Sequence, residues 1–205
     1  MTLTKYFFLL VFIYVFSSCT QTQTTKNTSI SLLKPKIEDV FINKKELVLN
    51  PKKGQWLYKK QPFNGYIIAY HENNALAEKT GFSNGKKQGK SFKYYKDGTI
   101  KRKAFYNNNK LHGKKLNYAN NGNLISESNY LNGKRHGIQK TWHPNGQLAK
   151  QRTLKNGKED GMQQAWLENG VLYINYETKN GRIFGLNRSN LCYKLKDEQI
   201  QYSKK

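Results

Sequence analysis

Four histidines are the residues whose chemistry is most readily recognised in the sequence, because an imidazole can bind a metal ion or transfer a proton. They are His71, His112, His136 and His143. His112 and His136 lie 24 residues apart, and further steps of that size reach Gln, Asp and Phe. If such positions lie two strands apart, their separation is about 10 Å, whereas a metal–imidazole bond is about 2.0–2.1 Å. We therefore predict turn residues and no metal site.

The other potentially reactive residues are not arranged for catalysis. The thirteen acidic residues are scattered, and the adjacent pairs at positions 159–160 and 197–198 direct their side chains apart in an extended chain. Ser126 and Ser128 have no glycine elbow around them, and the glycines are not spaced to cradle a phosphate. Cys192 is interpreted as a small apolar strand residue, with a reactive thiol as the alternative. The sequence predicts no catalytic residue and no cofactor.

Basic residues form a candidate binding feature that recurs along the chain. Lys and Arg number 36 against 13 Asp and Glu, which gives a formal net charge of +23. Eight of them lie in or beside a motif of the type N-G-K-x-x-G: Lys86, Lys87, Lys110, Lys114, Lys134, Arg135, Lys158 and Arg182. If this motif is a turn on one edge of a sheet, they form a basic ridge. Such a ridge is either a solvated edge that resists edge pairing or a surface that attracts anionic lipid or acidic polysaccharide.

The elements that would position these residues are repeats of 24 residues. Glycines recur at this spacing at Gly65, Gly89, Gly113, Gly137, Gly161 and Gly185. An aromatic residue follows each of the first five by five positions: Tyr70, Tyr94, Tyr118, Trp142 and Trp166. Further columns of Gly or Asn and of Leu or Ile keep the register, so five units span residues 65–184. A fixed period of this length is the signature of a repeat architecture.

Each unit is predicted to fold as two antiparallel strands. Sequences such as KDG, NNG and PNG are tight-turn signals, because Gly and Asn tolerate a positive φ. We interpret NGKKQG, NGKRHG and NGKEDG as a second, longer turn. The segments between them have strand lengths and are rich in Tyr, Phe, Ile and Leu. The predicted fold is all-β: an elongated, single-layer antiparallel meander of repeated β-hairpins, five units in all, with capping strands.

The segments that flank the repeats are predicted to cap them. Residues 32–64 contain alternating stretches without the 24-residue register, which predicts lead-in strands. Residues 185–205 are predicted to form a capping strand and a basic tail. The aromatic column then lies on one face of the sheet and offers a second candidate surface, suited to a protein partner.

The pattern G-x-x-x-x-[YW]-x-x-x-G-x-[LI], closing on N-G-K-x-x-G, resembles the MORN-repeat variant. This form is found in bacterial proteins labelled YwqK-type antitoxins, and the resemblance covers residues 61–185. The opening PFNG resembles the usual first unit of this family. The resemblance implies an elongated, twisted, single-layer antiparallel sheet. The antitoxin label is an inherited name that establishes no activity.

The N-terminal segment resembles a bacterial lipoprotein signal. Tyr6–Phe16 is a run of eleven apolar residues, short for a membrane-spanning helix of roughly 20 residues but matching the apolar region of a secretory signal. Two serines precede Cys19, as in a lipobox, although Phe16 stands where Leu is commoner. We predict a signal peptide at 1–18, lipidation of Cys19 and a flexible tether at 19–31. A plain secretory signal or an uncleaved anchor is the alternative.

Together these features predict an exported, membrane-anchored bacterial lipoprotein that faces the periplasm or the cell surface. It would act as a non-enzymatic binding or scaffolding surface in the cell envelope. Export argues against nucleic acid as the partner of the basic residues, which leaves an unknown protein partner or an anionic envelope lipid or glycan. The alternatives are a YwqK-type immunity protein that neutralises a toxin, and an electrostatic binder of anionic lipid or glycan.

Overall fold

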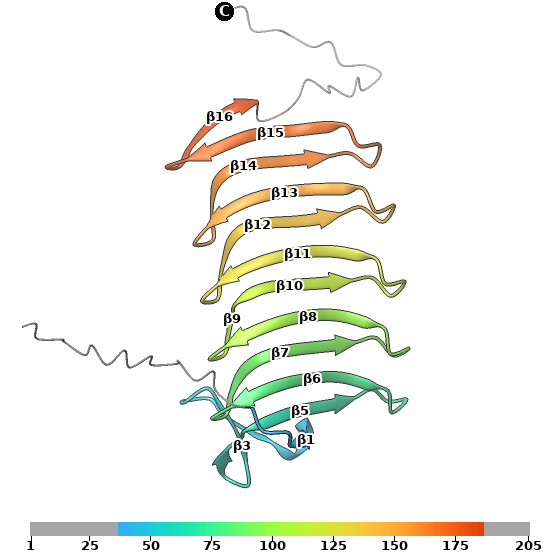
Figure 1. Cartoon of the computed structure of the whole chain (residues 1–205), viewed down its shortest axis with the longest axis vertical. Helices are drawn as coiled ribbons and strands as arrows, with labels where there is room; N and C mark the ends of the chain where they lie inside the picture. Colours follow the sequence, from blue (N-terminus) through green and yellow to red (C-terminus); the bar gives the residue numbers. More distant parts are fainter. Residues whose placement is uncertain (1–36, 187–205) are drawn as a thin grey trace, which may run out of the picture. The chain divides into compact units, whose positions relative to one another are not determined.

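The computed structural model describes residues 37–186, which form one long β-sheet and a small second sheet. The long sheet has 13 strands, and from β5 onward strands that are consecutive in the chain lie side by side, except that β9 pairs only with β8 (Figure 1). The strands of the repeats are β5 (Gly65–Tyr70), β6 (Leu76–Ser83), β7 (Lys86–Tyr94), β8 (Ile100–Asn107), β9 (Lys110–Leu111), β10 (Gly113–Tyr118), β11 (Leu124–Leu131), β12 (Lys134–Trp142), β13 (Leu148–Lys155), β14 (Lys158–Trp166) and β15 (Leu172–Lys179). The predicted all-β antiparallel meander of hairpins is confirmed.

Successive repeats are joined by two-residue turns. Strand β6 ends at Ser83 and β7 begins at Lys86, which leaves Asn84 and Gly85 as the connection. Their φ angles are 50° and 71°, and a turn with two positive φ angles matches the twist of the strands that it joins. The motif predicted to be the longer turn is therefore the shorter one. That prediction was wrong because the strand resumes immediately after the Asn-Gly pair.

The second glycine of the same motif marks a β-bulge. Gly89 has a φ of 74°, and the register between β6 and β7 shifts between Thr80 and Phe82. A bulge adds one residue to a strand and increases its twist, so the motif is long without forming a long turn. The positive φ predicted for four other repeat glycines is confirmed at Gly122, Gly133, Gly146 and Gly157.

The opposite ends of the hairpins are five-residue loops. In the second unit the loop is residues 95–99, between Tyr94 and Ile100. The Asp97 carboxylate accepts a hydrogen bond from the backbone N–H of Thr99 at 2.9 Å. The same turn is made in the other units by Asn73, Asn121, Asn145 and Asn169. Because the strands are antiparallel, these loops lie along one side of the sheet and the Asn-Gly turns along the other (Figure 1).

A cap of residues 41–62 precedes the repeats. It consists of β1 (Phe41–Asn43), the 3-10 turn η1 (Lys44–Glu46), β2 (Val48–Asn50), β3 (Gln55–Tyr58) and β4 (Gln61–Pro62). Strands β2–β4 form a separate three-stranded sheet, whereas β1 pairs with β5 in parallel. This parallel pair departs from the purely antiparallel sheet that the repeat pattern predicts.

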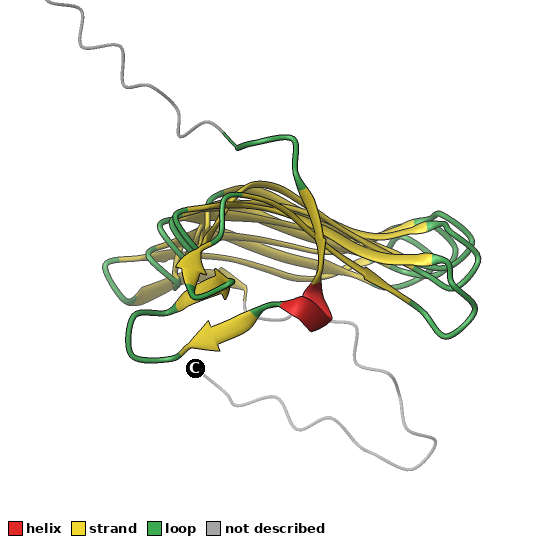
Figure 2. Ribbon diagram, turned by 90° about the horizontal axis from the view of Figure 1, so that it is seen from below, coloured by secondary structure: helices red, strands yellow, loops and turns green. Residues whose placement is uncertain are grey.

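The cap packs on one face of the long sheet, as the end-on view shows (Figure 2). A buried apolar cluster forms there: Leu47, Phe63, Ile67 and Phe82, with Ile42, Trp56 and Tyr58 packed around it. The backbone N–H of Trp56 also donates to the Gly85 carbonyl at 2.7 Å, which ties the cap to the first Asn-Gly turn. We call the face that carries Ile67 and Phe82 the cap-side face, and the other the far face.

Several predicted features lie outside the described residues: the signal peptide at 1–18, Cys19, the tether at 19–31, Cys192 and the basic tail. Strand β16 (Arg182–Leu186) is the last element that the structure describes, and it pairs with β15. Within residues 37–186, no helix is both long and apolar enough to cross a membrane.

Candidate binding surfaces

The Asn-Gly turns carry a row of basic residues, which we call the basic edge. Its members are the residues that follow each turn and begin the next strand: Lys86, Lys110, Lys134, Lys158 and Arg182. The turns are stacked by backbone hydrogen bonds, such as that from the Gly133 N–H to the Leu111 carbonyl at 2.8 Å. All members except Lys86 are exposed. The edge therefore places one cation per repeat along one side of the sheet.

The other three residues of the predicted basic ridge lie on the faces of the sheet. Lys87 lies on the cap-side face, where its Nζ is 5.2 Å from the ring centroid of Tyr106, and burial lowers its pKa. Arg135 lies on the same face, paired across strands with a tyrosine. Lys114 lies on the far face, with its Nζ 2.8 Å from the Glu127 carboxylate. The eight residues do not form a single ridge, because consecutive strand residues point to opposite faces.

The predicted aromatic column lies on the far face, near the five-residue loops. The ring of Tyr94 stacks with that of Phe92 at 6.4 Å, and burial raises its pKa. Lys103, which pairs with Phe92, has its Nζ 5.3 Å from the centroid of Tyr118. Successive members of the column lie two strands apart, at a spacing of about 10 Å. The side chain of Tyr70, its first member, is 51% exposed. The other members are Trp142 and Trp166, both half-buried. The column is thus a spaced series of rings rather than a continuous aromatic surface.

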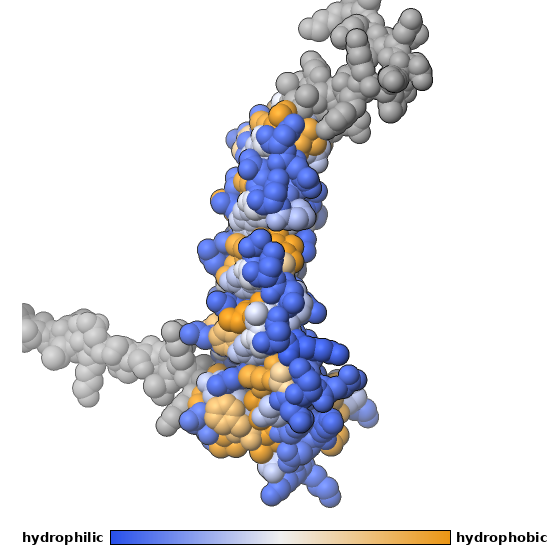
Figure 3. Space-filling view, turned by 90° about the vertical axis from the view of Figure 1, so that its right-hand side faces the viewer, coloured by the Kyte–Doolittle hydropathy of each residue, from blue (hydrophilic) through white to orange (hydrophobic). Residues whose placement is uncertain are grey.

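Two histidines link neighbouring repeats at the loop edge. The Nε2–H of His71 donates to the Tyr94 carbonyl at 3.0 Å, and that of His143 to the Trp166 carbonyl at 2.8 Å. In the second unit, the hydroxyl of Tyr95 donates to the Tyr118 carbonyl at 2.8 Å in the same way. Figure 3 looks onto this edge, where apolar surface is broadest at the capped end and hydrophilic surface interrupts it elsewhere. These histidines tie repeats together.

The remaining histidines are His112, which lies between β9 and β10, and His136, which lies in β12 rather than in a turn. The Nδ1 atoms of His112 and His136 are buried and have no hydrogen-bond partner among the described residues. Within residues 37–186, no three side chains of His, Cys, Asp or Glu lie close enough together to hold a metal ion.

A polar surface that the sequence analysis did not identify lies on the cap-side face, beyond the cap. Two rows of cross-strand neighbours run from β8 to β13. The first row is Arg102, Asn117, Ser126, Thr141 and Lys150; the second is Lys115, Ser128, Gln139 and Arg152. We call these nine residues the polar channel. All of them except Arg102 line a cavity of about 200 Å³, which Tyr130, Arg135 and Lys140 also line.

Hydrogen bonds fix the floor of the polar channel. Arg102 donates from Nε to the Asn117 Oδ1 at 3.0 Å, and Asn117 donates from Nδ2 to the Ser126 hydroxyl at 2.8 Å. The Gln139 Nε2 donates to the carbonyls of Asn129 and Gly137 at 3.0 and 3.2 Å. These carbonyls lie beside the register shift between β11 and β12. Gln139 therefore satisfies backbone acceptors at the bulge, and it is 6% exposed.

The charge of the polar channel is strongly one-sided. Four cations belong to it, Arg102, Lys115, Lys150 and Arg152, and none of the described residues that line the cavity is acidic. Arg152 has its Nη1 3.9 Å from the Glu159 carboxylate on β14. Lys115 and Lys150 make no ion pair within the described part of the chain. The channel is thus a cationic and hydrogen-bonding surface suited to an anionic ligand.

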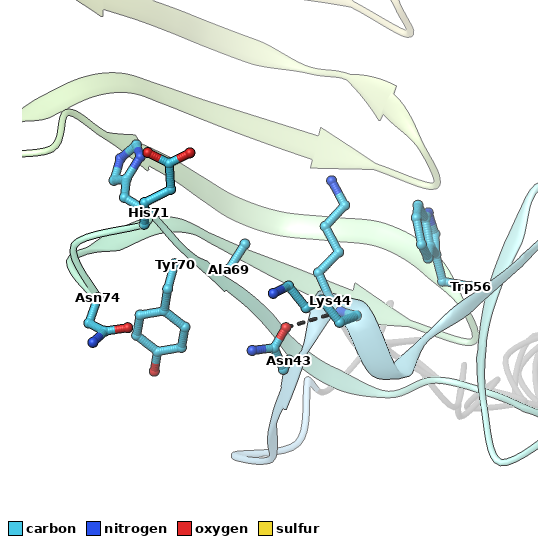
Figure 4. A pocket seen from close by; sticks show the side chains of 9 residues that line it. Asn43, Lys44, Trp56, Ala69, Tyr70, His71 and Asn74 are labelled. Atoms are coloured by element: carbon cyan, nitrogen blue, oxygen red, sulfur yellow. Dashed lines mark hydrogen bonds between the residues drawn. The ribbon is translucent and has the colours of Figure 1, made fainter.

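Another cavity, of about 560 Å³, lies where the cap meets the first hairpin (Figure 4). Lys44 extends along it between Trp56 and the first loop, and its Nζ is 5.8 Å from the Trp56 ring and 3.7 Å from the Glu78 carboxylate. His71, on the opposite wall, is bonded to a backbone carbonyl. Lys44 thus joins the cap to the sheet in this cavity, whereas His71 joins one repeat to the next.

The polar channel was missed because the repeat columns that define it vary in residue type. The column of Gln139, for example, holds Ser91, Lys115 and Gln163 in the other units. The available signal was strand alternation, which would have placed these columns on one face once the bulge at each repeat glycine was counted. Without the bulge, residues after the glycine are assigned to the wrong face.

Three segments of the chain match the MORN repeat variant, at residues 87–108, 111–132 and 135–156. They run from β7 to β13 and contain all nine residues of the polar channel. No curated protein matches the chain. The MORN repeats suggest a binding or scaffold role based on the repeated hairpins.

Proposed function

We propose that this chain is an exported, lipid-anchored, non-enzymatic protein whose repeat sheet is a binding or scaffolding surface in the bacterial cell envelope. The observation that carries the proposal is the cap-side face beyond β7, which no described element covers. It presents amides, hydroxyls and cations in the fixed register of the sheet. Repeated hairpins hold such groups at constant spacing, which suits an extended partner.

The envelope location in this proposal rests on the sequence. The apolar run Tyr6–Phe16 leads directly into two serines and Cys19. A lipid on Cys19 and the cations of the basic edge would together supply the two signals that stable membrane attachment requires. The segment at 19–31, rich in Thr, Gln, Asn and Ser, would then separate the lipid from the sheet.

The anchor is tested by fractionating cells that express the full chain or its Cys19→Ala variant. We expect the wild-type chain in membranes with an acylated Cys19 by intact mass, and the variant either released or retained as an uncut precursor. A membrane-derived chain with an unmodified Cys19 would contradict the anchor.

The binding role is tested by chemical crosslinking in intact envelopes, followed by capture of the full chain. Crosslinks from the cap-side face to one recurrent partner would support the proposal. Capture of a toxin would instead support the immunity-protein alternative. Recovery of the chain without any crosslinked partner, lipid or glycan would contradict a binding role.

A further inference from the structure

We propose that the polar channel binds a segment of acidic polysaccharide. This inference names the ligand class of the binding surface proposed above and rests on that function, but it does not depend on the lipid anchor. Three properties of the channel support it: where its cations lie, what lies between them, and where the exposed apolar side chains lie.

The cations occupy the two ends of the channel. Arg102 and Lys115 lie on β8 and β10, whereas Lys150 and Arg152 lie together on β13. Arg102 and Lys150 are four strand spacings apart, which corresponds to about 19 Å. Lys115 and Arg152 are three strand spacings apart, which corresponds to about 14 Å. A ligand that engages both ends must therefore carry anionic groups separated by such a distance. This requirement favours a chain with repeated charges over a single small anion.

Between these two pairs of cations, the cavity is lined mostly by neutral hydrogen-bonding side chains, with Arg135 beside them. Ser126, Ser128 and Thr141 present hydroxyls there, and Asn117 presents an amide that is held by hydrogen bonds, whereas the amide of Gln139 is buried beneath them. The hydroxyls of Ser128 and Thr141 make no hydrogen bond within the described residues. Hydroxyl groups both donate and accept, so they complement the hydroxyls of a sugar. Carboxylates on the same sugar chain would meet the cations at the ends.

The same pattern argues against a membrane surface as the ligand. Binding to a bilayer usually combines cations with apolar side chains that enter the interface. On β8–β14, the exposed large apolar side chains alternate onto the far face, away from the channel: Phe105, Ile125, Leu131, Ile138 and Met162. The channel floor is polar instead. Single-stranded nucleic acid, which is bound by positive grooves with stacking aromatic side chains, would find one ring beside the cavity, that of Tyr130.

The inference is tested with the full chain purified in detergent and fluorescent oligogalacturonate fragments as the probe. Two double variants remove the same charge: Lys115→Gln with Lys150→Gln in the channel, and Lys134→Gln with Lys158→Gln on the basic edge. The channel variant should weaken binding roughly tenfold or more, because it removes a charge-assisted contact at each end. The edge variant should stay within about twofold, as expected for exposed charges outside a site. Thermal melting checks that both variants fold like the wild type.

Three further probes complete the test: a neutral oligosaccharide of matched length, anionic phosphatidylglycerol vesicles, and single-stranded DNA. We expect each to bind more weakly than the acidic fragment and to be indifferent to the channel variant. Equal losses in the two variants, or equal affinity for DNA, would overturn the inference in favour of unspecific electrostatic attraction. Binding to vesicles alone would overturn it in favour of lipid. If no probe binds but envelope crosslinking captures a protein, the inference fails and the broader binding function stands.

Discussion

The capped end and the open repeats are built from the same 24-residue unit but use the cap-side face in opposite ways. In the first unit this face carries Phe82, which is 2% exposed and packs under the cap. At the same position the later units hold Tyr106, Tyr130, Leu154 and Thr178. The residue at this position becomes less aromatic as its distance from the cap increases. The comparison shows that the turns and bulges determine the strand pairing of the sheet. Whether the cap packs on a face determines which side chains that face carries.

A second column shows the same change in polar residues. In the capped end the hydroxyls of Thr80 and Ser91 bond each other at 2.7 Å and both are buried. The position of Ser91 becomes Lys115, Gln139 and Gln163 in the following units. Two of these replacements still bond backbone carbonyls beside a bulge. The open face therefore keeps a structural role at this position through the buried Gln139 and Gln163, and only Lys115 of the three is half-exposed.

The largest expected effect tests whether the apolar core is confined to the capped end. Phe82→Ala should reduce the free energy of unfolding by about 3–5 kcal/mol, because it removes a buried ring and leaves a cavity. Phe105→Ala, at a far-face phenylalanine that is 39% exposed, should cost less than about 2 kcal/mol. Urea denaturation followed by tryptophan fluorescence measures both. Equal losses would mean that the open repeats depend on their exposed face as strongly as the capped end depends on its core.

The next effect compares one turn position in the two regions. Gly85 and Gly157 both end an Asn-Gly turn, with φ angles of 71° and 88°. A Cβ on Gly85 would lie 2.8 Å from the Trp56 carbonyl oxygen, whereas a Cβ on Gly157 would meet nothing within 4 Å. Gly157→Ala should therefore cost about 1–2 kcal/mol from backbone strain alone, and Gly85→Ala should cost more.

Gly157→Asn is the matched control for this comparison. Asn109 occupies the equivalent position of another unit at a φ of 66°, so asparagine should be tolerated at 157 with a smaller loss than alanine. Thermal denaturation of the three variants gives the order. If Gly85→Ala were no worse than Gly157→Ala, the cap would not restrain the first turn.

The repeat register and the strand pairing were predictable because they depend on local backbone chemistry. Turn residues such as Gly133 and Asn84 can be recognised in the sequence, because few residue types tolerate a positive φ. The assignment of turn lengths failed at NGKKQG because a glycine in a bulge and a glycine in a turn look alike in sequence. The same ambiguity concealed which residues share a face of the sheet. Lys87 was therefore assigned to the basic ridge, although its side chain lies on the cap-side face.

The cap and the polar channel could not be predicted from the repeat pattern for another reason. The parallel pairing of β1 with β5 joins Phe41 to Tyr66, and its neighbour Ile42 packs on the core cluster under η1 and β2–β4. The parallel pairing of β1 with β5 depends on tertiary packing and not on a local period in the sequence. The channel depends on contacts such as that between Arg102 and Asn117, which are 15 residues apart. Such a pair is found only once the strand register is known.

A smaller effect tests the structural role of the bulge glutamines. Gln163, which is 1% exposed, donates from Nε2 to the carbonyls of Thr153 and Gly161 at 2.8 and 3.1 Å. Gln163→Leu should cost about 1–3 kcal/mol, because it leaves buried acceptors unpaired. The control Gln151→Leu changes a half-buried far-face glutamine on the neighbouring strand. Amide hydrogen exchange across β13 and β14 should quicken in the first variant only; equal exchange would remove the proposed role.

The smallest effect on stability, and the clearest test of the basic edge, comes from replacing Lys86, Lys110, Lys134 and Lys158 with Gln. Side chains that follow an exposed turn contribute little to folding, so each change should alter stability by no more than about 0.5 kcal/mol. Any effect on binding would instead depend on salt, because the Debye length falls from about 10 Å at 0.1 M to about 3 Å at 1 M. Affinity for anionic vesicles or acidic glycan, measured against salt, separates the two roles. A steep curve for the wild-type chain that flattens in the four-site variant would show that the edge attracts anionic partners. Two steep curves that coincide would leave the basic edge as a charged margin that keeps the turns of neighbouring molecules apart, and would leave the polar channel as the surface of the repeats that recognises an anionic ligand. Two flat and indistinguishable curves would contradict electrostatic recognition at both surfaces.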